Sequence, residues 1–296
     1  MPLPDRIEGA LRTSLERCLQ PGHPPRLAAA MQHAVFPGGA RIRPKLVLAV
    51  AHACGDDDPA LADAAAVAVE LLHCASLVHD DLPCFDNAAT RRGLPSVHSA
   101  FGERLAVLAG DALIVLAFEA VGAAAGDHLA RLPGLLQTVS QGVGMPHGIA
   151  AGQSWECEPQ VVLSDYQQAK TGALFAAATM AGAQAAGADP APWRALGQQL
   201  GLAYQVADDI RDVLGDTLQS GKPVGQDVLL DRPSMARTLG LEGALDEFER
   251  LVAATQARVP ACPGAKAFRG LIALEAERLL PGGLVGARGR RPTVAA

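Results

Sequence analysis

The sequence predicts an all-α protein, and three observations lead to this fold class. Of the 296 residues, 49% are apolar and only 4% are aromatic. Alanine and leucine are strong helix formers, whereas the β-branched and aromatic residues that fill sheets are scarce apart from valine. Proline and glycine also divide the chain into segments of helix length. Together these features favour an all-helical globule.

Proline and glycine mark the ends of the successive predicted helices. Pro21-Gly22 closes the first segment, Gly38-Gly39 follows the second, and Gly55 follows the third. The fourth is a long apolar helix that runs directly into an acidic pair, and the fifth follows a polar loop. The expected helices span residues 4–20, 26–34, 41–54, 59–82, 102–125, 127–143, 163–187, 191–215 and 243–258, with an interrupted helix near Pro233.

No repeat of fixed period and no long linker divides the chain. We therefore expect a single domain over residues 1–296, with its core at about 26–260 and a flexible Arg-rich tail at about 282–296. The net charge of −6 argues against binding to nucleic acid. No apolar run reaches about 18–20 residues without a charge, so no membrane span is expected. The six cysteines form no CxxC pair, and no signal peptide is apparent, which favours a cytoplasmic location.

The first acidic cluster follows the apolar helix 59–82. It contains Asp80, Asp81 and Asp86, and Pro83 prevents the helix from continuing regularly. Carboxylates at the C-terminal end of a helix are repelled by the helix dipole. We therefore expect cations close to these acids.

The second acidic cluster contains Asp208, Asp209 and Asp212 within an uninterrupted helical pattern. Asp208 and Asp212 are four residues apart and so lie on one face of the helix, where like charges are destabilising. A divalent cation would reverse that effect, and oxygen ligands without His or Cys favour Mg²⁺. A solvated helix surface is the alternative for either cluster alone.

Basic residues occur in several short segments between and around the acidic clusters. Arginine matches phosphate oxygens with a planar fork and lysine with a compact charge. These residues and the acids indicate an enzyme that binds one or two diphosphates in a helical, apolar cavity. The basic residues are Arg41 and Arg43 after Gly38-Gly39, Arg91-Arg92, Lys170 before Thr171-Gly172, and Lys222 after Gly221.

In their order along the chain, these motifs resemble the trans-isoprenyl diphosphate synthases over about residues 36–240. A single DDxxD motif is weak evidence, since terpene cyclases also carry one. Two such motifs with an arginine pair and a Lys-Thr between them are specific. The matching segments are Gly38–Pro44, His73, Asp80–Asp86, Arg91–Gly93, Gly110-Asp111, Gly152-Gln153, Lys170–Gly172, Tyr204-Gln205, Asp208–Asp212 and Gly221-Lys222.

The resemblance implies an all-α fold of roughly ten or more helices around a deep central cavity, usually in a homodimer. It also implies about three Mg²⁺ ions per active site, with Mn²⁺ as an alternative. The diphosphate of an allylic substrate departs, isopentenyl diphosphate attacks the resulting carbocation, and loss of a proton gives a product five carbons longer. A dry cavity protects the cation from water.

The resemblance also implies roles for individual residues. The Mg²⁺ ligands would be Asp80, Asp86 and Asp208, with Asp81, Asp209 and Asp212 beside them. The allylic diphosphate would contact Arg91, Lys170 and Lys222. The diphosphate of isopentenyl diphosphate would contact Arg43, His73 and Arg92, with Arg41 as a further basic residue. Thr171 and Gln205 would lie beside the reacting carbons.

The chain departs from the family pattern at a few positions. Ala40 stands where most relatives have a lysine for isopentenyl diphosphate, so affinity for that substrate would fall unless Arg41 compensates. Glu156 stands where an aspartate is common, and Arg232 lies near the position of a common lysine. Ala88-Ala89 replaces acids that often precede the arginine pair. None of these departures removes one of the expected Mg²⁺ ligands.

Product length depends on the residues one turn before Asp80. An isoprene unit adds about 5 Å, close to one helical turn. Ala75 and Ser76 are both small, whereas relatives that stop at fifteen carbons commonly have an aromatic residue at one of these positions. With the inserted Pro83-Cys84, this resembles bacterial geranylgeranyl diphosphate synthases of carotenoid and photosynthetic pathways. We therefore expect a twenty-carbon product.

Other functions remain open from the sequence. A farnesyl diphosphate synthase would need another floor for its cavity, such as Leu71 or Leu72. A terpene cyclase would carry a mixed Asn/Ser/Glu second motif. A non-catalytic partner subunit would have lost part of a motif, and a plain helical interaction protein would leave the two acidic clusters unexplained.

Overall fold

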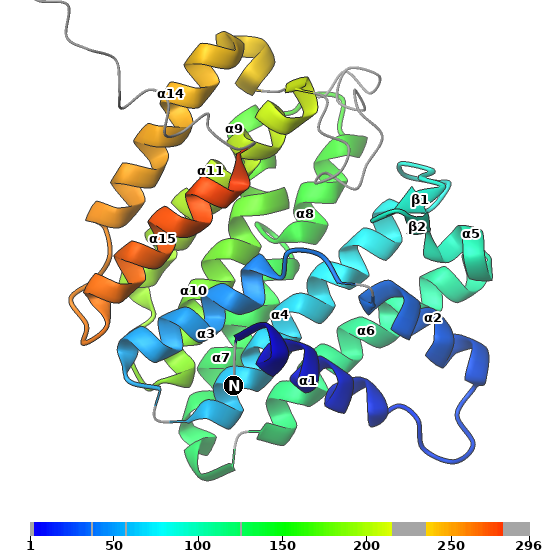
Figure 1. The fold of residues 1–296 in the computed structure, drawn as a ribbon. Helices are drawn as coiled ribbons and strands as arrows, with labels where there is room; N and C mark the ends of the chain where they lie inside the picture. Colours follow the sequence, from blue (N-terminus) through cyan, green and yellow to red (C-terminus); the bar gives the residue numbers. More distant parts are fainter. Residues whose placement is uncertain (1–2, 37, 57, 125, 215–234, 281–296) are drawn as a thin grey trace, which may run out of the picture.

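The computed structural model describes residues 3–36, 38–56, 58–124, 126–214 and 235–280. Within them it is an assembly of helices (Figure 1). These are α1 (Leu3–Glu16), α2 (Pro25–Val35), α3 (Ile42–Cys54), α4 (Pro59–Asp80), α5 (Val97–Phe101), α6 (Glu103–Ala124), α7 (Leu132–Val143), α8 (Ile149–Ser154), α9 (Leu163–Gln167), α10 (Ala173–Ala185), α11 (Ala191–Leu214), α14 (Met235–Ala257) and α15 (Ala265–Leu279). The all-α prediction is confirmed.

Short elements connect these helices. A small antiparallel hairpin, β1 (Thr90–Arg91) with β2 (Leu94–Pro95), follows the first acidic motif. Two 3₁₀ turns, η1 (Gly126–Arg131) and η2 (Trp155–Cys157), precede α7 and follow α8, and a π-helical turn, η3 (Gln168–Gly172), joins α9 to α10. The sequence-based prediction missed the hairpin, α5, α8 and α15. It also treated residues 163–187 as one helix.

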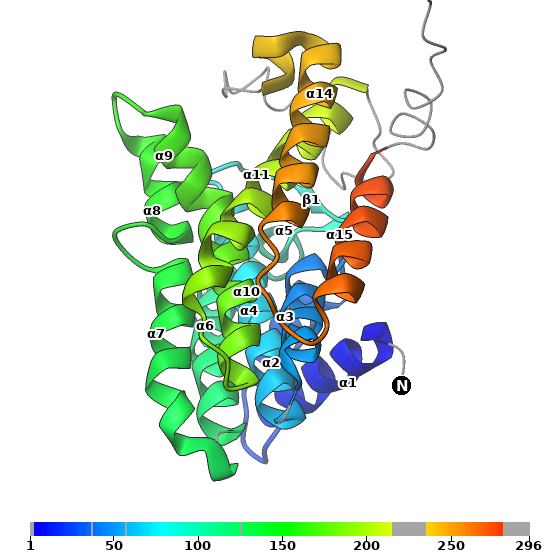
Figure 2. The same cartoon turned by 90° about the vertical axis from the view of Figure 1, so that its left-hand side faces the viewer.

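The core is built around α4, which packs against α3, α6 and α10. Most of its side chains are alanine, valine and leucine, so neighbouring helices approach it closely on several sides. Gly110 of α6 lies against the imidazole of His79, and a Cβ at this glycine would collide with that ring. In Figure 1, α4 and α6 run side by side, and Figure 2 shows α7, α8 and α9 following one another along one edge of the molecule.

The two ends of the described chain also contribute to the core. Leu11 of α1 is fully buried, and Phe268 of α15 packs edge-to-face on Trp193 of α11, with ring centroids 5.4 Å apart. The core therefore extends on both sides of the predicted segment 26–260. The expected helix near Pro233 and the expected flexible tail lie outside the described residues.

Two helices, α4 and α6, are long and apolar enough to cross a membrane by length and composition. Of the apolar window in α4, 78% is buried inside the fold, as in a core helix, whereas the figure for α6 is 44%. The outward side of α6 exposes Val107, Leu108 and Val115. The expectation of no membrane span stays a prediction.

Candidate active site

The first acidic motif lies where α4 ends, as predicted. Asp80 is the last residue of α4, and Asp81 follows it as the C-terminal cap. The chain then turns back on itself, because the backbone N–H of Asp86 donates to the carbonyl of Asp80 at 2.9 Å. Pro83 and Cys84, the two extra residues of the motif, are exposed on this turn. The turn thus brings Asp86 close to Asp80.

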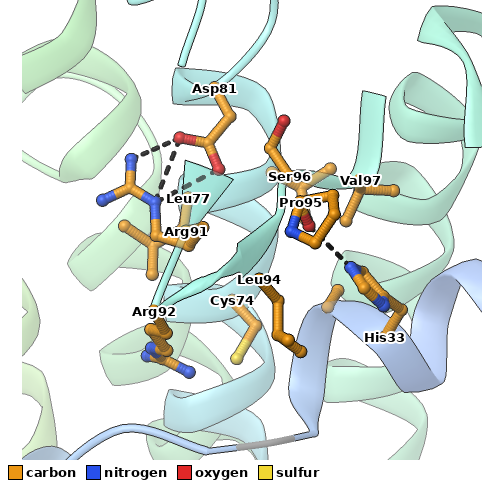
Figure 3. A pocket seen from close by; sticks show the side chains of 12 residues that line it. His33, Cys74, Leu77, Asp81, Arg91, Arg92, Leu94, Pro95, Ser96 and Val97 are labelled. Atoms are coloured by element: carbon orange, nitrogen blue, oxygen red, sulfur yellow. Dashed lines mark hydrogen bonds and ion pairs between the residues drawn. The ribbon is translucent and has the colours of Figure 1, made fainter. Parts of the chain in front are cut away.

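Cations surround these acids, as the unfavourable helix dipole led us to expect. Arg91 Nε of the hairpin donates to both carboxylate oxygens of Asp81, at 3.0 and 3.1 Å (Figure 3). Lys170 Nζ lies 3.8 Å from Asp80 Oδ2, and Gln153 Nε2 donates to Asp80 Oδ1 at 3.0 Å. Three segments far apart in sequence therefore converge on this motif.

Lys170 is placed by the π-helical turn η3 and by α8. A Cβ at Gly152 would lie 2.4 Å from the backbone of Lys170, so only glycine allows α8 to approach η3 so closely. Lys170 Nζ contacts Glu156 Oε1 at 2.5 Å, and the Tyr166 hydroxyl donates to the same oxygen at 2.5 Å. The ammonium is therefore fixed between Glu156 and the first acidic motif.

The second acidic motif lies in the last turns of α11. Asp208 is 42% exposed at its side chain and accepts a hydrogen bond from Arg211 Nη2 at 2.8 Å. Asp212 follows one turn later on the same face and is half-buried, which agrees with the predicted spacing.

Asp209, predicted to lie beside the Mg²⁺ ligands, does not share the face of Asp208 and Asp212. It is only 2% exposed. Its Oδ1 accepts from Gln205 Nε2 at 2.9 Å, and its Oδ2 accepts from the backbone N–H of Met235 at 2.7 Å. One residue advances about 100° around a helix, so Asp209 points inward where Asp208 points outward. Its carboxylate connects α11 to the start of α14.

A chain of contacts joins the two acidic motifs. Lys170 lies beside Asp80, and its neighbour Thr171 donates from Oγ1 to Gln205 Oε1 at 3.1 Å. Gln205 in turn donates to Asp209 in the second motif. Lys170, Thr171 and Gln205 therefore lie between the two motifs, and the substrate contacts predicted for them stay predictions.

A separate cluster of basic side chains lies beside α4. Arg43 Cζ lies 4.7 Å from the ring centroid of Phe175, and its buried Nε has no hydrogen-bond partner. The guanidinium of Arg92 lies against Gly39, where a Cβ would be 2.9 Å from Arg92 Cζ. In Figure 3, Arg92 points away from Asp81, whereas Arg91 points toward it.

Burial and nearby arginines determine the charge of this cluster. Burial lowers the pKa of Arg43 from its usual value, and the charge of Arg92 lowers it further. Burial holds the pKa of His73 well below its usual value, and Arg43, Arg92, Arg91 and Arg41 add to that effect. His73 is therefore a neutral imidazole among cations. An orphaned guanidinium nitrogen and this excess of positive charge form a site suited to an anion.

Arg41 was predicted with Arg43 and Arg92 as a substrate-binding residue. In the structure its side chain is directed into the protein interior. Its side chain is 5% exposed, and its three guanidinium nitrogens donate to Glu8, Glu70 and the carbonyl of Val35. Each guanidinium nitrogen of Arg41 therefore already donates to a group within the protein.

Ala75 and Ser76, the predicted chain-length residues, differ in their surroundings. Ala75 is 1% exposed, whereas Ser76 is half-buried. Gln153 Nε2 donates both to the carbonyl of Ser76 and to Asp80 Oδ1, so Ser76 lies on the side of α4 that carries the acid. Ser76 is thus the better placed of the two to meet a chain that descends from Asp80.

An apolar cavity of about 210 Å³ lies between α1, α3, α10, α11, α14 and α15. Phe175 and Tyr204 separate it from Arg43, and neither Ala75 nor Ser76 lines it. The deep cavity expected beneath the first acidic motif therefore stays a prediction.

The donor set of the two acidic motifs fits a hard divalent cation. Asp80 and Asp86 on one side, and Asp208 and Asp212 on the other, offer only carboxylate oxygens, the ligands that Mg²⁺ prefers. Among the described residues, no three acidic, histidine or cysteine side chains form a preassembled metal cluster. A cation held here would be completed by oxygens of the substrate or of water, as is usual for Mg²⁺.

Two predicted residues lie outside the described part of the chain, and the contacts of three others were not predicted. Lys222, predicted to contact the allylic diphosphate, lies outside the described residues, as does Arg232. Glu70 was missed because nothing in the sequence marks which side of an apolar helix faces an arginine. Glu156 and Gln153 were noted only as parts of motifs, and their contacts with Lys170 and Asp80 depend on the tertiary packing of α8.

Comparison with known proteins defines the class to which this fold and site belong. The family model described as polyprenyl synthetase matches residues 24–268, so the chain belongs to that family. It is 51% identical over 281 residues to the geranylgeranyl diphosphate synthase of Cereibacter sphaeroides, covering 95% of this chain and 98% of the relative. It is 49% identical to the enzyme of the same name from Rhodobacter capsulatus, covering 95% and 97%.

A solved structure supports the same assignment. The geranyltransferase of Helicobacter pylori, complexed with magnesium and isoprenyl diphosphate, aligns with a TM-score of 0.77 at 29% identity. The alignment covers 94% of this chain and 98% of that one. The fold is therefore shared with a prenyl-transferring enzyme over most of the chain.

Proposed function

We propose that this protein is a Mg²⁺-dependent trans-prenyltransferase that condenses isopentenyl diphosphate with allylic diphosphates, with a twenty-carbon main product. The observation that carries the proposal is the contact chain from Asp80 through Lys170, Thr171 and Gln205 to the second acidic motif. The 51% identity to a geranylgeranyl diphosphate synthase over nearly the whole chain supports the same reaction.

The acidic motifs provide the metal-binding side of the site. Asp80, Asp86 and Asp208 would hold Mg²⁺, with Asp81 and Asp212 beside them. When bound, Mg²⁺ neutralises the charge that develops on the departing diphosphate. A relative that was crystallised with magnesium and isoprenyl diphosphate supports this use of a divalent cation, and Mn²⁺ is an alternative. By family resemblance, about three ions would act together.

The basic residues bind the two diphosphates separately. Lys170 and Arg91, which contact the first acidic motif, would meet the allylic diphosphate, with Lys222 as a third cation. Arg43, Arg92 and the neutral His73 would hold the diphosphate of isopentenyl diphosphate without a metal. His73 Nδ1 or Nε2 can donate a hydrogen bond in its neutral form, so the imidazole needs no charge for this role.

The twenty-carbon product follows from the small side chains one turn below Asp80. Ser76 is small and half-buried on the side of α4 that carries Asp80, so it leaves room for a fifteen-carbon starter to descend along the helix. In a farnesyl diphosphate synthase, Leu71, Leu72 or a residue of α6 would instead close the bottom of the product cavity. The twenty-carbon product would be the one that carotenoid and photosynthetic pathways use in the bacterial synthases that this chain resembles.

One assay tests the proposal. Purified protein is incubated with Mg²⁺, labelled isopentenyl diphosphate and dimethylallyl, geranyl or farnesyl diphosphate, and the dephosphorylated products are separated by chain length. A twenty-carbon alcohol is expected. Products that stop at fifteen carbons would indicate a farnesyl diphosphate synthase. Absence of turnover with every starter would point to a non-catalytic partner subunit and overturn the proposed activity.

We also propose a homodimer in the cytoplasm. The exposed apolar side of α6, with Val107, Leu108 and Val115, is the surface on which a second copy would pack. Analytical ultracentrifugation of the protein and of Leu108→Asp checks this: the substitution is expected to convert a dimer into a monomer. Subcellular fractionation with antibody detection checks the location.

A further inference from the structure

A buried ion pair joins the loop before α3 to the middle of α4. Arg41 Nη1 lies 2.6 Å from Glu70 Oε1, and the two side chains are 5% and 2% exposed. Arg41 Nε also donates to Glu8 Oε1 of α1 at 2.8 Å, and its Nη2 donates to the carbonyl of Val35 at 2.8 Å. One guanidinium therefore connects three segments of the chain: α1, the end of α2, and α4.

The backbone around Arg41 is shaped to make this pair. Arg41 has a φ of +51°, a left-handed conformation that is uncommon for a residue other than glycine. A Cβ at Gly38 would lie 2.4 Å from the Arg41 guanidinium, so the loop folds directly over its own arginine. The left-handed turn sends the Arg41 side chain inward to Glu70, and Arg43 follows two residues later in the first turn of α3.

The same loop also contacts the other arginine of the anion site. Gly39, the neighbour of Gly38, lies against the guanidinium of Arg92, and a Cβ there would be 2.9 Å away from its Cζ. Residues 38–39 are thus placed between the guanidinium of Arg41 on one side and that of Arg92 on the other. Any displacement of Arg41 would move Gly39, and with it the surface on which Arg92 rests.

A buried ion pair is weak evidence of stabilisation, because desolvation offsets much of the attraction between its charges. The geometry of the pair supports a different role better than stabilisation, namely positioning the neighbouring arginines Arg43 and Arg92. Glu70 also provides a negative charge close to Arg43, which favours the charged form of a guanidinium that burial disfavours. The geometry of the pair therefore bears on the position of the anion site.

We propose that Arg41 and Glu70 are positioning residues, which fix the loop 38–43 so that Arg43 and Arg92 face one metal-free diphosphate together. This inference rests on the proposed function, since it names the isopentenyl diphosphate site. Arg41 acts there through Arg43 and Arg92 and does not touch the substrate, which replaces the role predicted for it from sequence.

The test compares Glu70→Gln and Arg41→Lys with a matched control, Asp63→Asn. Asp63 Oδ1 pairs with Arg6 Nε at 2.6 Å and also ties α1 to α4, but it does not touch the loop 38–43. Glu70→Gln is expected to raise the KM for isopentenyl diphosphate about tenfold, the effect of losing one charged hydrogen bond, and to leave the KM for farnesyl diphosphate unchanged. Arg41→Lys, which keeps the charge, is expected to fall between the wild type and Glu70→Gln.

A binding measurement separates this inference from the proposed activity. Isothermal titration with isopentenyl diphosphate, without Mg²⁺ or allylic substrate, is expected to show the same tenfold loss of affinity in Glu70→Gln and none in Asp63→Asn. If Glu70→Gln does not fold, Arg41→Met/Glu70→Leu removes both charges together and is expected to fold with the same loss. Equal binding by the wild type and these variants would overturn the inference, as would absence of metal-free binding by the wild type, whatever turnover shows.

Discussion

The ammonium nitrogen of Lys170 lies 2.5 Å from Glu156 Oε1, closer than the 3.8 Å that separates it from Asp80 Oδ2. Glu156 is the residue at which this chain departs from the aspartate common in its family. The longer glutamate side chain reaches the lysine directly and holds it at the edge of the first acidic motif. Lys170 is thereby kept near the place where the allylic diphosphate would bind.

Replacement of Lys170 should therefore impair the reaction strongly. We expect Lys170→Met to lower kcat/KM for the allylic substrate by about 100- to 1000-fold, the usual effect of removing one group that stabilises developing negative charge. Steady-state kinetics with saturating isopentenyl diphosphate measures this. Lys266→Met, which removes an exposed lysine of α15, is the matched control. A similar loss in both variants would contradict a specific role for Lys170.

Asp208 and Asp209 should respond differently to the same substitution. Asp209→Asn leaves one acceptor oxygen where Gln205 Nε2 and the backbone N–H of Met235 both donate, so we expect a loss of about 1–3 kcal/mol in the free energy of unfolding. Asp208→Asn should leave stability almost unchanged and raise the Mg²⁺ concentration needed for activity. Urea denaturation and Mg²⁺ titration of turnover measure the two effects. An equal shift of Mg²⁺ dependence in both variants would restore Asp209 as a ligand.

Product length should depend on Ser76 more cleanly than on Ala75. Ser76→Phe places an aromatic ring on the half-buried side below Asp80, and we expect products to stop at fifteen carbons. Ala75→Tyr should also shorten the product, but Ala75 is 1% exposed, so overpacking should cost about 1–3 kcal/mol of stability. Labelled product analysis and thermal denaturation measure both outcomes. If neither variant changed product length, the gating position would be elsewhere.

The neutral state of His73 should make stability depend on pH. Its pKa is lowered in the folded protein, so below pH about 6.5 the unfolded chain binds a proton that the folded chain does not. The stability contributed by neutral His73 is present above that pH and is lost as pH falls, by up to about 1.4 kcal/mol per pH unit. His73→Gln should flatten this slope, as measured by urea denaturation between pH 5 and 7. His147→Gln, at an exposed position, should leave the slope as it is in the wild type.

Much of the fold and the arrangement of motifs could be predicted because they depend on local patterns. Apolar periodicity and proline and glycine positions located most of the long helices, and the helix dipole predicted cations around Asp80. The i, i+4 spacing placed Asp208 and Asp212 on one face. Spacing alone could not show that Asp209 would accept a hydrogen bond from the backbone N–H of Met235. That contact depends on where α14 begins, 26 residues later.

Arg41 illustrates a second limit. Its place beside Arg43 in a basic motif made both look like phosphate ligands. A left-handed backbone angle turns one of them into the core and leaves the other beside the anion site. Helix α15 was missed for a related reason. It carries many charged residues, and the Trp193–Phe268 contact that docks it is visible only in the folded protein.

Three of the acids discussed above already have a resident cation: Asp81 has Arg91, Asp80 has Lys170 nearby, and Asp208 has Arg211. A divalent cation bound by these acids would have to compete with these partners, and each side chain that it displaced would become available to a diphosphate. The cation and the diphosphate would consequently strengthen each other's binding, and by thermodynamic reciprocity each would do so to the same extent. Cooperative assembly of this kind would disfavour a metal-loaded enzyme without its substrate.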